Sequence, residues 1–399
     1  MICQLDTLRR CMPSSIRKVL NELPTTLDDT YERALEGIPK EKRQHAHHLF
    51  HCLVGAIRPL RAEELAEIFA IDFDRDAMSN FMDGWRPENA EEAVLSTCST
   101  LISVVEDKGS KIVQFSHFSV KEFLTSDRLR TSKVGDIRHY HVCMDAAHTI
   151  LVRACLAVLM QLDENVDHKH LETFPLALYV AKHWVNHAQY DEVASRVQDA
   201  MEELFNPSKP YLAAWFRIRG VTGGLDVEDL TEHLSRPKAA ALYHAAEHGF
   251  GGVVDYLVTM HAADVNEESS LGAALHVASR YGHAEVVYLL LQRHADVNIR
   301  STKDYKRTPL HFASANGRAK VVSLLLEHGA DINAQTTFHT TPLKNASQHG
   351  HLDVVRLLLA HGADVHIRDT GGDSLFQMAT LNGHVAIGQL LLEHGAKID

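Results

Sequence analysis

The segment from Thr308 to Asp331 constrains the fold of this chain more than any other part of its sequence. Its residues, TPLHFASANGRAKVVSLLLEHGAD, predict two short helices joined near Gly317. Thr308 is a favourable N-cap, and Pro309 suits the first helical position because its fixed φ is helical and its missing N–H has no partner there. The second helix ends at Gly329, which can adopt a left-handed conformation. Two such helices cannot bury all of their own leucine side chains, so the hairpin must stack on similar hairpins.

Copies of this hairpin recur along the C-terminal part of the chain. The small residue buried in the first helix recurs at spacings of 33, 35, 33 and 33 residues, in the order Ala245, Ala278, Ala313, Ala346 and Ala379. A period near 33 with a T-P-L-H-x-A start and an H-G-A-D end resembles the ankyrin repeat. The resemblance implies that residues 238–399 form five ankyrin repeats, an α-solenoid with a concave binding surface and no chemistry.

The loops between the predicted repeats vary where the helices are constant, so we expect the partner-binding residues there. The loop Ile299–Arg307 contains two extra residues and surrounds an aromatic side chain with cations. Its candidate residues are Arg300, Lys303, Tyr305, Lys306 and Arg307, and the next loop carries Phe338 and His339 at its tip. An aromatic residue among flexible cations is typical of an interface anchor. A partner with an acidic or mixed surface would suit it, and a solvated loop is the alternative interpretation.

Composition and charge limit the other classes of partner. The net charge is −12, and neither residues 1–237 nor residues 238–399 have the surplus of Lys and Arg that phosphate-backbone binding needs. The six cysteines show no C-x-x-C spacing, which favours buried reduced thiols. The sequence shows neither a signal-peptide pattern nor an apolar run of membrane-spanning length. We therefore expect a cytoplasmic protein that binds neither nucleic acid nor membranes, and the sequence leaves its oligomeric state open.

Residues 25–130 predict a winged helix. Helical patterns come first, followed by two β-rich runs that a short turn joins, and then by one more helix. The expected helices cover residues 27–38, 41–57, 62–70 and 91–101, and the expected strands cover residues 101–105 and 112–115. Helices followed by a small hairpin are typical of this fold.

The last helix of this region is predicted to begin directly behind His117. Ser119 and Glu122 fit a capping box, in which each side chain bonds to a backbone N–H at the helix start. Phe118 and Phe123 fit a hydrophobic staple across the same turn.

Residues 131–237 predict a helical linker domain. Apolar runs from Ala146 to Leu162 and from Pro175 to Ala188 indicate two helices. A polar helix near residues 226–234 stands directly before the repeats, where it is a candidate cap on the first repeat. Residues 1–24 predict one or two short helices that do not form a domain.

The order of these motifs resembles one family over nearly the whole chain. The segments that carry the resemblance are QLDTLRR, IRKVLNELPTTLDDTYERAL, AIRPLRAEELAEIF, FSHFSVKEFL and the tract around His183 and Trp184. They look like the region that follows the ATPase domain in fungal NACHT-type (STAND) signalling NTPases with ankyrin repeats. The resemblance implies a nucleotide-switched NACHT module, a winged helix that closes on it, a helical linker and a repeat array that senses a partner.

The chain departs from that family in one respect. It contains no G-x-x-x-x-G-K-[ST] sequence, whose backbone N–H groups and Lys would hold the phosphates of a nucleotide. It begins about where the ATPase domain of such a protein would end, as expected of a truncated gene product, a fragment or a stand-alone C-terminal half. Residues 1–24 are then the helical linker that follows the missing module.

His117 stands where the winged helices of that family place a histidine that contacts bound ADP. A helix N-terminus also suits a phosphate, because its N–H groups lack partners. Without the phosphate-binding loop one histidine cannot hold a nucleotide, so we expect a relic nucleotide sensor or a packing role, and no cofactor.

A DNA-binding winged helix would use its third helix, RAEELAEIFA, in the major groove. This helix is expected to present Glu63, Glu64 and Glu67 with only Arg61 to offset them, which would repel phosphate.

His47, His48 and His51 have the one-turn spacing of a helical metal site. No Cys or carboxylate completes a site nearby, so we expect a solvated or partly packed helix face and no metal. The motifs G-x-S-x-G and H-E-x-x-H are absent, so we expect no enzyme activity.

Histidines also recur at fixed positions of the predicted repeats, where hydrogen bonds within and between repeats are expected. They are His276, His311, His328, His361 and His394. His294 replaces the glycine that follows the second helix of later repeats, and a histidine in the left-handed region costs about 1 kcal/mol. The first repeat gains a residue near Met260, so we expect the N-terminal half of the array to be softer.

The sequence therefore predicts a non-catalytic scaffold or sensor that binds a protein partner through the loops and inner helices of the repeats. The alternative is the regulatory half of a nucleotide-switched NACHT ATPase whose phosphate-binding module lies upstream or on another chain.

Overall fold

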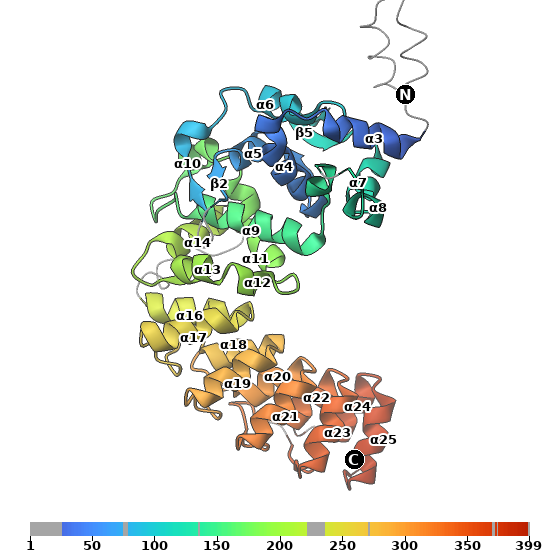
Figure 1. Ribbon diagram of the computed structural model, residues 1–399. Helices are drawn as coiled ribbons and strands as arrows, with labels where there is room; N and C mark the ends of the chain where they lie inside the picture. The colour runs from blue at the N-terminus through green and yellow to red at the C-terminus, as the bar shows by residue number, and fades with distance from the viewer. Residues whose placement is uncertain are drawn as a thin grey trace, which may run out of the picture. The chain divides into compact units, whose positions relative to one another are not determined.

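The computed structural model describes residues 26–74, 79–134, 136–221, 236–269, 272–368, 372 and 374–397. The chain divides into two compact units, Met1–Ala200 and Met201–Asp399. The described structure is 58% helix and 6% strand, with a small antiparallel sheet in the first unit and stacked helical hairpins in the second (Figure 1). This confirms the predicted fold class. The helices expected within residues 1–24 and 226–234 lie outside the described residues.

A set of helices and a small sheet form the N-terminal part of the first unit. Its elements are α3 (Leu27–Glu36), η2 (Lys40–Lys42), α4 (Arg43–Gly55), β1 (Leu60–Arg61), α5 (Ala62–Ile68), β2 (Ile71–Asp72), β3 (Asn80–Phe81), η3 (Asp83–Trp85), α6 (Ala90–Cys98), β4 (Ile102–Asp107), β5 (Ser110–Phe115), α7 (Phe118–Leu124) and α8 (Asp127–Arg130). One sheet has the antiparallel strand order β1-β5-β4, so the predicted hairpin is confirmed. Lys108 and Gly109 form its turn with φ angles of 50° and 78°, the backbone geometry that matches the strand twist.

The start of α7 confirms one prediction and corrects two. The helix begins directly behind His117, but His117 itself is the N-cap, because its Nδ1 accepts a hydrogen bond from the Ser119 N–H. The predicted capping box is therefore wrong, and the Ser119 hydroxyl bonds instead to the Tyr31 hydroxyl at 2.7 Å. The predicted staple is also wrong. Phe118 occupies the first helical position, one residue inside the N-cap, and its side chain is 71% exposed, whereas Phe123 is buried.

Helix α5 does not present the acidic face that its sequence suggests. Glu64 and Glu67 are 0% and 4% exposed, and only Glu63 lies at the surface. Buried carboxylates need partners, and here Arg58 binds Glu64 while Arg86 binds Glu67 at 2.9 Å. The expectation that Glu64 and Glu67 would repel DNA phosphates from this helix is therefore wrong.

The rest of the first unit is helical, as predicted. Its elements are η4 (Ile137–Tyr140), α9 (Met144–Leu159), α10 (His168–Thr173), α11 (Ala177–Ala188) and α12 (Val193–Arg196). Helix α9 packs against both α4 and α11. His48 and His51 on α4 are buried, and His51 Nδ1 bonds to the His47 carbonyl at 2.8 Å. This helix face is therefore packed, as one of the two expectations had it, and the expectation of a solvated face is wrong.

A buried hydrogen-bond chain joins α9 and α11. The Ile57 N–H donates to the Tyr179 hydroxyl at 3.2 Å, and that hydroxyl lies within hydrogen-bond distance of His187 Nε2 at 2.7 Å. His187 Nδ1 and His148 Nδ1 share a further hydrogen bond, also of 2.7 Å. Burial lowers the pKa of His187 to about 3.

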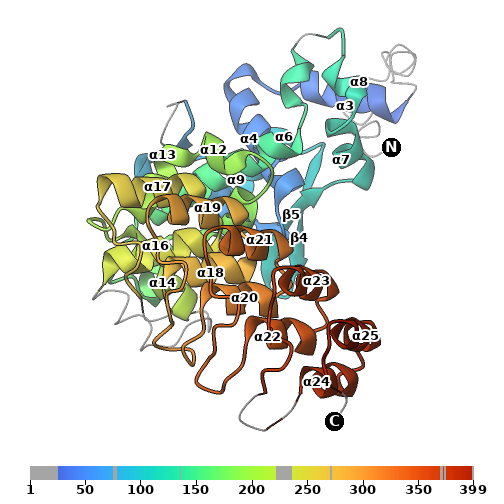
Figure 2. The same cartoon turned by 90° about the horizontal axis from the view of Figure 1, so that it is seen from below.

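Helix α13 (Gln198–Phe205) spans the boundary between the units, and α14 (Tyr211–Val221) lies in the second, followed within the described residues by five helical hairpins. Their inner and outer helices are α16 (Pro237–Glu247) and α17 (Gly251–Met260), α18 (Ala274–Tyr281) and α19 (Ala284–Gln292), α20 (Pro309–Ala315) and α21 (Ala319–Glu327), α22 (Pro342–Gln348) and α23 (Leu352–Ala360), and α24 (Leu375–Leu381) and α25 (Val385–Glu393). Inner helices contact inner helices of the next hairpin, and outer helices contact outer ones. Figure 2 shows the connecting loops projecting on the side of the inner helices.

Neighbouring hairpins are held together by one repeated contact. A ring nitrogen of His351, at the start of an outer helix, donates to the Ala315 carbonyl at the end of the preceding inner helix (3.0 Å). The ring lies so close to Gly317 that a Cβ there would stand 2.6 Å from His351 Nδ1. The same contact recurs in the pairs His283–Glu247, Arg318–Arg280 and His384–Gln348, against Gly249, Gly282 and Gly350 respectively.

The histidines of the T-P-L-H positions have a fixed protonation state. The Thr308 N–H donates to His311 Nδ1 at 3.2 Å, so this nitrogen carries no hydrogen. His311 Nε2 donates to the Thr340 carbonyl in the next connection at 2.9 Å. His276 makes the same pair of bonds with Ala273 and Ile299. The predicted hydrogen bonds within and between repeats are therefore confirmed.

The backbone irregularities of the first two hairpins are also as predicted. His294 has a φ of 65°, in the left-handed region where Gly329 has 86°. Ala262, in the loop with the extra residue, has a φ of 49°. The expected softness of this half stays a prediction.

We predict that Gly317→Ala destabilises the protein by about 2 kcal/mol, because the new Cβ adds backbone strain at φ 68° and displaces the His351 ring. Gly362→Ala is the matched control. Its φ is 85°, but no atom lies within 4 Å of a Cβ there, so it should lose only about 1 kcal/mol. Urea unfolding of both variants measures the difference, and equal losses would contradict the role of the ring contact.

We also predict that the protein is less stable at pH 5.5 than at pH 7.5. Burial lowers the pKa of His311 to about 4, with smaller opposing effects of its hydrogen bond to Thr340, and burial lowers the pKa of His276 as well. The unfolded chain therefore takes up protons below about pH 6.5 while the folded chain does not, which costs roughly 1 kcal/mol for His311 at pH 5.5. Melting temperatures at the two pH values test this, and His311→Gln should reduce the difference.

Candidate functional site

The long loop Ile299–Arg307 has a rigid tip. Its backbone is closed by hydrogen bonds from the Ser301 N–H to the Arg307 carbonyl and from the Arg307 N–H to the Asp304 carbonyl, both 2.9 Å. Tyr305 and Lys306 between them have φ angles of 49° and 59°. Residues other than glycine rarely adopt this left-handed backbone region, and each one that does lowers the stability of the fold by on the order of 1 kcal/mol. The fixed conformation of the tip therefore reduces the stability of the fold.

That shape brings two predicted anchor residues together. The Tyr305 and Phe338 rings lie 5.0 Å apart between centroids, and their planes are inclined at 54°. The Thr337 N–H donates to the Tyr305 carbonyl at 3.0 Å and fixes the second loop against the first. Tyr305 is 57% exposed and Phe338 is 52% exposed. Two loops from successive repeats thus present one exposed aromatic pair, which we call the tip pair.

The predicted cations around the tip pair fall into two groups. Arg300 donates to the Gln335 carbonyl at 2.8 Å, and Arg307 contacts Asp304 at 3.3 Å, so both stabilise the loops themselves. Lys303 and Lys306 lie exposed at the surface of the long loop. His339, with a φ of 54°, bonds through Nδ1 to the Gln335 amide oxygen at 2.7 Å. The two lysines therefore lie at the surface of the same loop as Tyr305.

A row of asparagines that the sequence reasoning missed aligns the loops. Asn298 Oδ1 accepts a hydrogen bond from the Asp331 N–H of the next repeat at 2.7 Å. The equivalent pairs are Asn266–Asp296 and Asn333–Asp364. The signal was a D-x-N sequence at the start of the first three loops, beginning at Asp264, Asp296 and Asp331. Glu268 adds a further contact, because its carboxylate accepts from the Thr302 N–H and hydroxyl.

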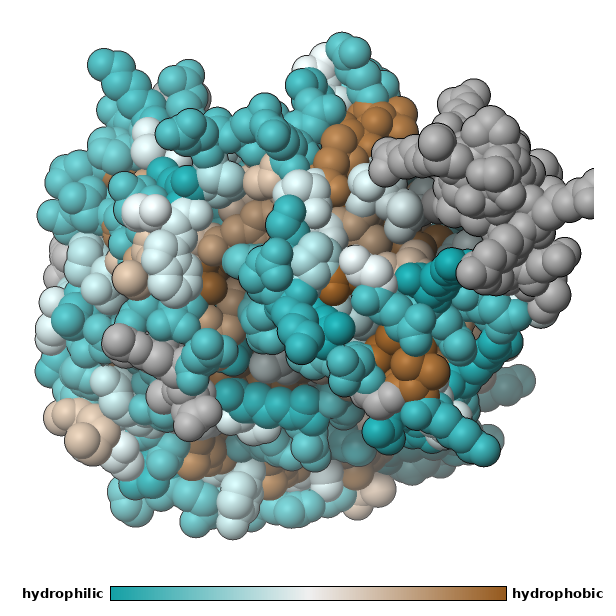
Figure 3. Space-filling model, turned by 45° about the horizontal axis from the view of Figure 1, so that its top comes forward, coloured by the Kyte–Doolittle hydropathy of each residue, from teal (hydrophilic) through white to brown (hydrophobic). Residues whose placement is uncertain are grey.

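The inner helices also carry exposed apolar side chains. Tyr281 at the end of α18 is 46% exposed, and Leu381 at the end of α24 is 80% exposed. On the face shown in Figure 3, apolar side chains form small separate patches among hydrophilic ones. Tyr281 and Leu381 are thus exposed apolar side chains on two different inner helices.

His117 in the first unit has an exposed side chain. Its Nδ1 lies 2.6 Å from the Ser119 hydroxyl in addition to accepting the Ser119 N–H. The adjacent Phe118 ring lies 4.3 Å from the His117 ring. The helix start expected to face a nucleotide therefore presents one imidazole and one apolar ring at the surface.

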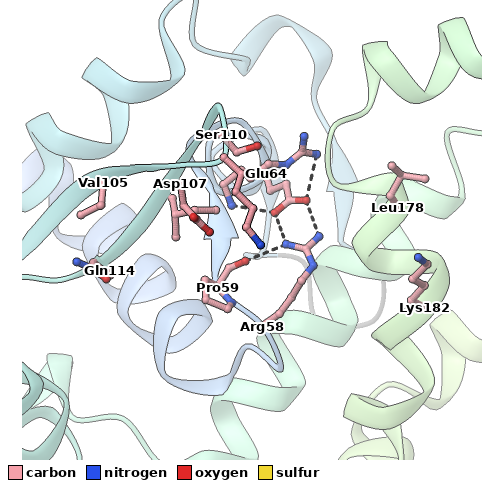
Figure 4. A pocket seen from close by; sticks show the side chains of 12 residues that line it. Arg58, Pro59, Glu64, Val105, Asp107, Ser110, Gln114, Leu178 and Lys182 are labelled. Carbon is pink, nitrogen blue, oxygen red and sulfur yellow. Dashed lines mark hydrogen bonds and ion pairs between the residues drawn. The ribbon is translucent and has the colours of Figure 1, made fainter.

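A pocket of about 670 Å³ in the first unit lies between the β4–β5 hairpin, the loop before α5 and α11 (Figure 4). Arg58 binds the Glu64 carboxylate through two bonds of 2.6 and 2.8 Å, and the Arg61 N–H adds a third at 2.8 Å. Burial alone would raise the pKa of Glu64, but these bonds outweigh it and lower the pKa. Lys182 stands on the α11 side of the pocket (Figure 4). The Glu64 carboxylate is thus fully engaged by the two arginines of the pocket wall.

Helix α5 carries a second buried carboxylate, Glu67. Glu67 accepts a hydrogen bond from the Leu176 N–H at 2.7 Å and pairs with Arg86. Burial nevertheless raises the pKa of Glu67 to about 7. Arg86 in turn lies over the Phe174 ring at 4.4 Å. These contacts of Glu67 and Arg86 join segments that are far apart in the sequence, and their role is to stabilise the fold.

Comparison with known families identifies the two kinds of domain. Residues 31–134 match the family model described as "GPI inositol-deacylase, winged helix domain". Residues 225–301 and 242–336 match "Ankyrin repeats (3 copies)", and residues 325–379 match "Ankyrin repeats (many copies)". The chain contains a winged helix domain and ankyrin repeats. The predicted motif assignments are thereby confirmed, and the winged helix is of a type associated with the NACHT family.

One similar curated protein is the "Azaphilone pigments biosynthesis cluster protein L" of Monascus ruber. The two sequences are 30% identical over 296 residues, which cover 70% of this chain. The chain spans 61% of the length of that relative. Across the described ranges, every helix is too short or too polar to cross a membrane.

Proposed function

We propose that this chain is a non-catalytic scaffold or sensor that binds a protein partner through its ankyrin loops and inner helices. The observation that carries the proposal is the tip pair, two exposed aromatic rings from successive loops held 5.0 Å apart. Tyrosine is enriched among the residues that dominate the binding energy of an interface, and phenylalanine is enriched in interfaces generally.

The strained backbone of the long loop supports this role. A flexible loop loses conformational entropy when it binds, which weakens the complex. Here the left-handed residues Tyr305 and Lys306 and the bonds to Thr337 fix the tip before any partner arrives. Strain of this kind persists where the surrounding structure enforces it, and it concentrates at binding sites. The loop is therefore built to bind with a small ordering cost.

The charges beside the tip pair favour a partner with an acidic or mixed surface. Lys303 and Lys306 are exposed next to Tyr305. The whole chain carries a net charge of −12, so this basic loop is a local exception. Complementary charges at the rim of an interface raise the association rate and select among partners.

The sequence supports the negative parts of the proposal. It lacks the motifs of nucleophilic and metal-dependent hydrolases, and its net charge disfavours a phosphate backbone. We accordingly propose no enzyme activity, no nucleic-acid partner and a cytoplasmic location.

The second candidate is the regulatory half of a nucleotide-switched NACHT ATPase of the fungal STAND type. The exposed His117 and Phe118 at the start of α7 favour it, because an apolar ring that is 71% exposed suits a surface that another module covers. We propose the corresponding organisation as a linker in residues 1–24, a winged helix in 25–130, a helical linker domain in 131–237 and five ankyrin repeats in 238–399.

We predict that the double variant Tyr305→Ala, Phe338→Ala no longer captures the partner that the wild-type chain captures from an extract of its source cells. Each anchor should contribute about 2 kcal/mol. The melting temperature should stay unchanged, because both side chains are exposed.

The matched control is Tyr288→Ala, Val385→Ala, which removes side chains that are 52% and 64% exposed on the outer helices α19 and α25. This variant should retain the partner. If both double variants retain it, or both lose it, the tip pair is not the anchor.

We also predict that the chain alone does not bind ADP, because a single histidine at a helix N-terminus cannot replace a phosphate-binding loop. Isothermal titration calorimetry with ADP checks this. Micromolar binding that His117→Ala abolishes would contradict the prediction and favour the nucleotide-switched alternative.

A further inference from the structure

The last turn of α16 brings together three side chains that commonly bind metals. His244, Glu247 and His248 have the spacing i, i+3, i+4, which places them on one helix face. Glu247 Oε2 lies 2.8 Å from His244 Nδ1 and 3.7 Å from His248 Nε2. The three ligand atoms lie within 4.8 Å of one another, and the described residues contain no other such group of three.

These distances are close to those of a metal centre. Tetrahedral zinc with bonds of about 2.0–2.1 Å places its ligand atoms about 3.3 Å apart. The separations of 2.8 and 3.7 Å stand on either side of that value. Small side-chain rotations on the same helical turn would equalise them without moving the backbone.

The three residues are not required by the repeat itself. At the position of His244 the other repeats have Val277, Phe312, Asn345 and Met378, so the repeat needs no imidazole there. The contact between repeats uses only the backbone carbonyl of Glu247, which accepts a hydrogen bond from His283. The Glu247 side chain is thus left to the two histidines.

We propose that His244, Glu247 and His248 bind a divalent transition-metal ion of the zinc type. Two imidazoles and one carboxylate suit Zn²⁺, Co²⁺, Ni²⁺ and Cu²⁺, whereas Mg²⁺ and Ca²⁺ prefer oxygen ligands alone. Three protein ligands leave a position for water. The side chains of Glu247 and His248 are 22% and 16% exposed, so an ion can reach them from solvent.

The surroundings hold the ligands in place and in the right charge state. The Phe216 ring lies 4.4 Å from the His244 ring, and the Trp215 ring lies 5.9 Å from the His248 ring. Burial lowers the pKa of His248 to about 4, against the opposing effect of Glu247, so its imidazole is neutral at pH 7. Burial raises the pKa of Glu247, but the hydrogen bond from His244 and the nearby positive charges outweigh it, so the carboxylate is ionised.

The positive charge of Arg219 should repel a bound cation, so substituting Arg219 provides a specific test of metal binding. Its guanidinium lies 5.3 Å from the Trp215 ring centre, and its charge acts on both Glu247 and His248. A bound dication would feel the same charge as repulsion. Removing that charge should strengthen metal binding, an effect that a purely structural His–Glu pair would not show.

The experiment uses the whole purified chain with CoCl₂ and ZnCl₂ at pH 7.5. Cobalt should produce the visible absorption of a site with nitrogen and oxygen ligands, and zinc should displace it and raise the melting temperature. Glu247→Gln and His248→Ala should each weaken cobalt binding at least tenfold, and Arg219→Gln should strengthen it severalfold. MgCl₂ should have no effect.

The chain has 28 histidines, so a variant outside the cluster is needed as a control. His366 is exposed on a loop of the fourth repeat, and His366→Ala should leave cobalt binding unchanged. The proposal is overturned if wild type, Glu247→Gln and His248→Ala bind cobalt equally, or if only His366→Ala reduces binding. Circular dichroism shows that the variants are folded, and partner capture by the tip pair is an independent measurement.

Discussion

The second unit depends on a side chain of one repeat reaching the helix end of the repeat before it. His351 is representative, because its ring fills the space that Gly317 leaves empty and donates to the Ala315 carbonyl. The contact satisfies a carbonyl at a helix C-terminus, where the helix itself provides no donor. It also sets how closely and in which register two hairpins stack, since the ring fits only against a residue without a Cβ. The leucines of the helices supply most of the stabilisation by burial, but burial does not fix an orientation. The hydrogen bond and ring contact of His351 are directional, so they do.

The binding surface follows from that register. Tyr305 and Phe338 belong to different repeats, so their rings can lie together only if the stacking distance is fixed. The asparagine row and the bond from Thr337 to the Tyr305 carbonyl then carry the register of the helices into the loops. The left-handed backbone at the tip lowers the stability of the loops. It persists because the regular stack beneath them holds the loops in place. Scaffold and site are thus separate in sequence but coupled through hydrogen bonds between repeats.

The sequence predicted what depends on local pattern. The period of the repeats, the hairpin of the winged helix and the helix start behind His117 all follow from residues close together in the chain. The burial of Glu67 did not follow, because Leu176, which helps to satisfy it, lies 109 positions away. Phe118 was misassigned because the N-cap is His117, two residues before the expected Ser119, which places Phe118 inside the helix. At the candidate site, residue type pointed to Tyr305 and Phe338, but only the structure shows that their rings touch.

The histidines of this chain differ in function because their nitrogens differ in partners. In His311 one nitrogen accepts a backbone N–H and the other donates to a carbonyl, so no lone pair is available and a metal could bind only by breaking the framework. His244 instead bonds to a carboxylate, a partner that can share an ion with it, and its neighbour His248 reaches the same oxygen. Two histidines of the same repeat array, with the same chemistry in isolation, thus support the stack in one case and are proposed to bind an ion in the other. What distinguishes them is the group opposite Nδ1, a backbone N–H or a carboxylate, and that follows from whether the residue occupies the T-P-L-H position or faces Glu247 on α16.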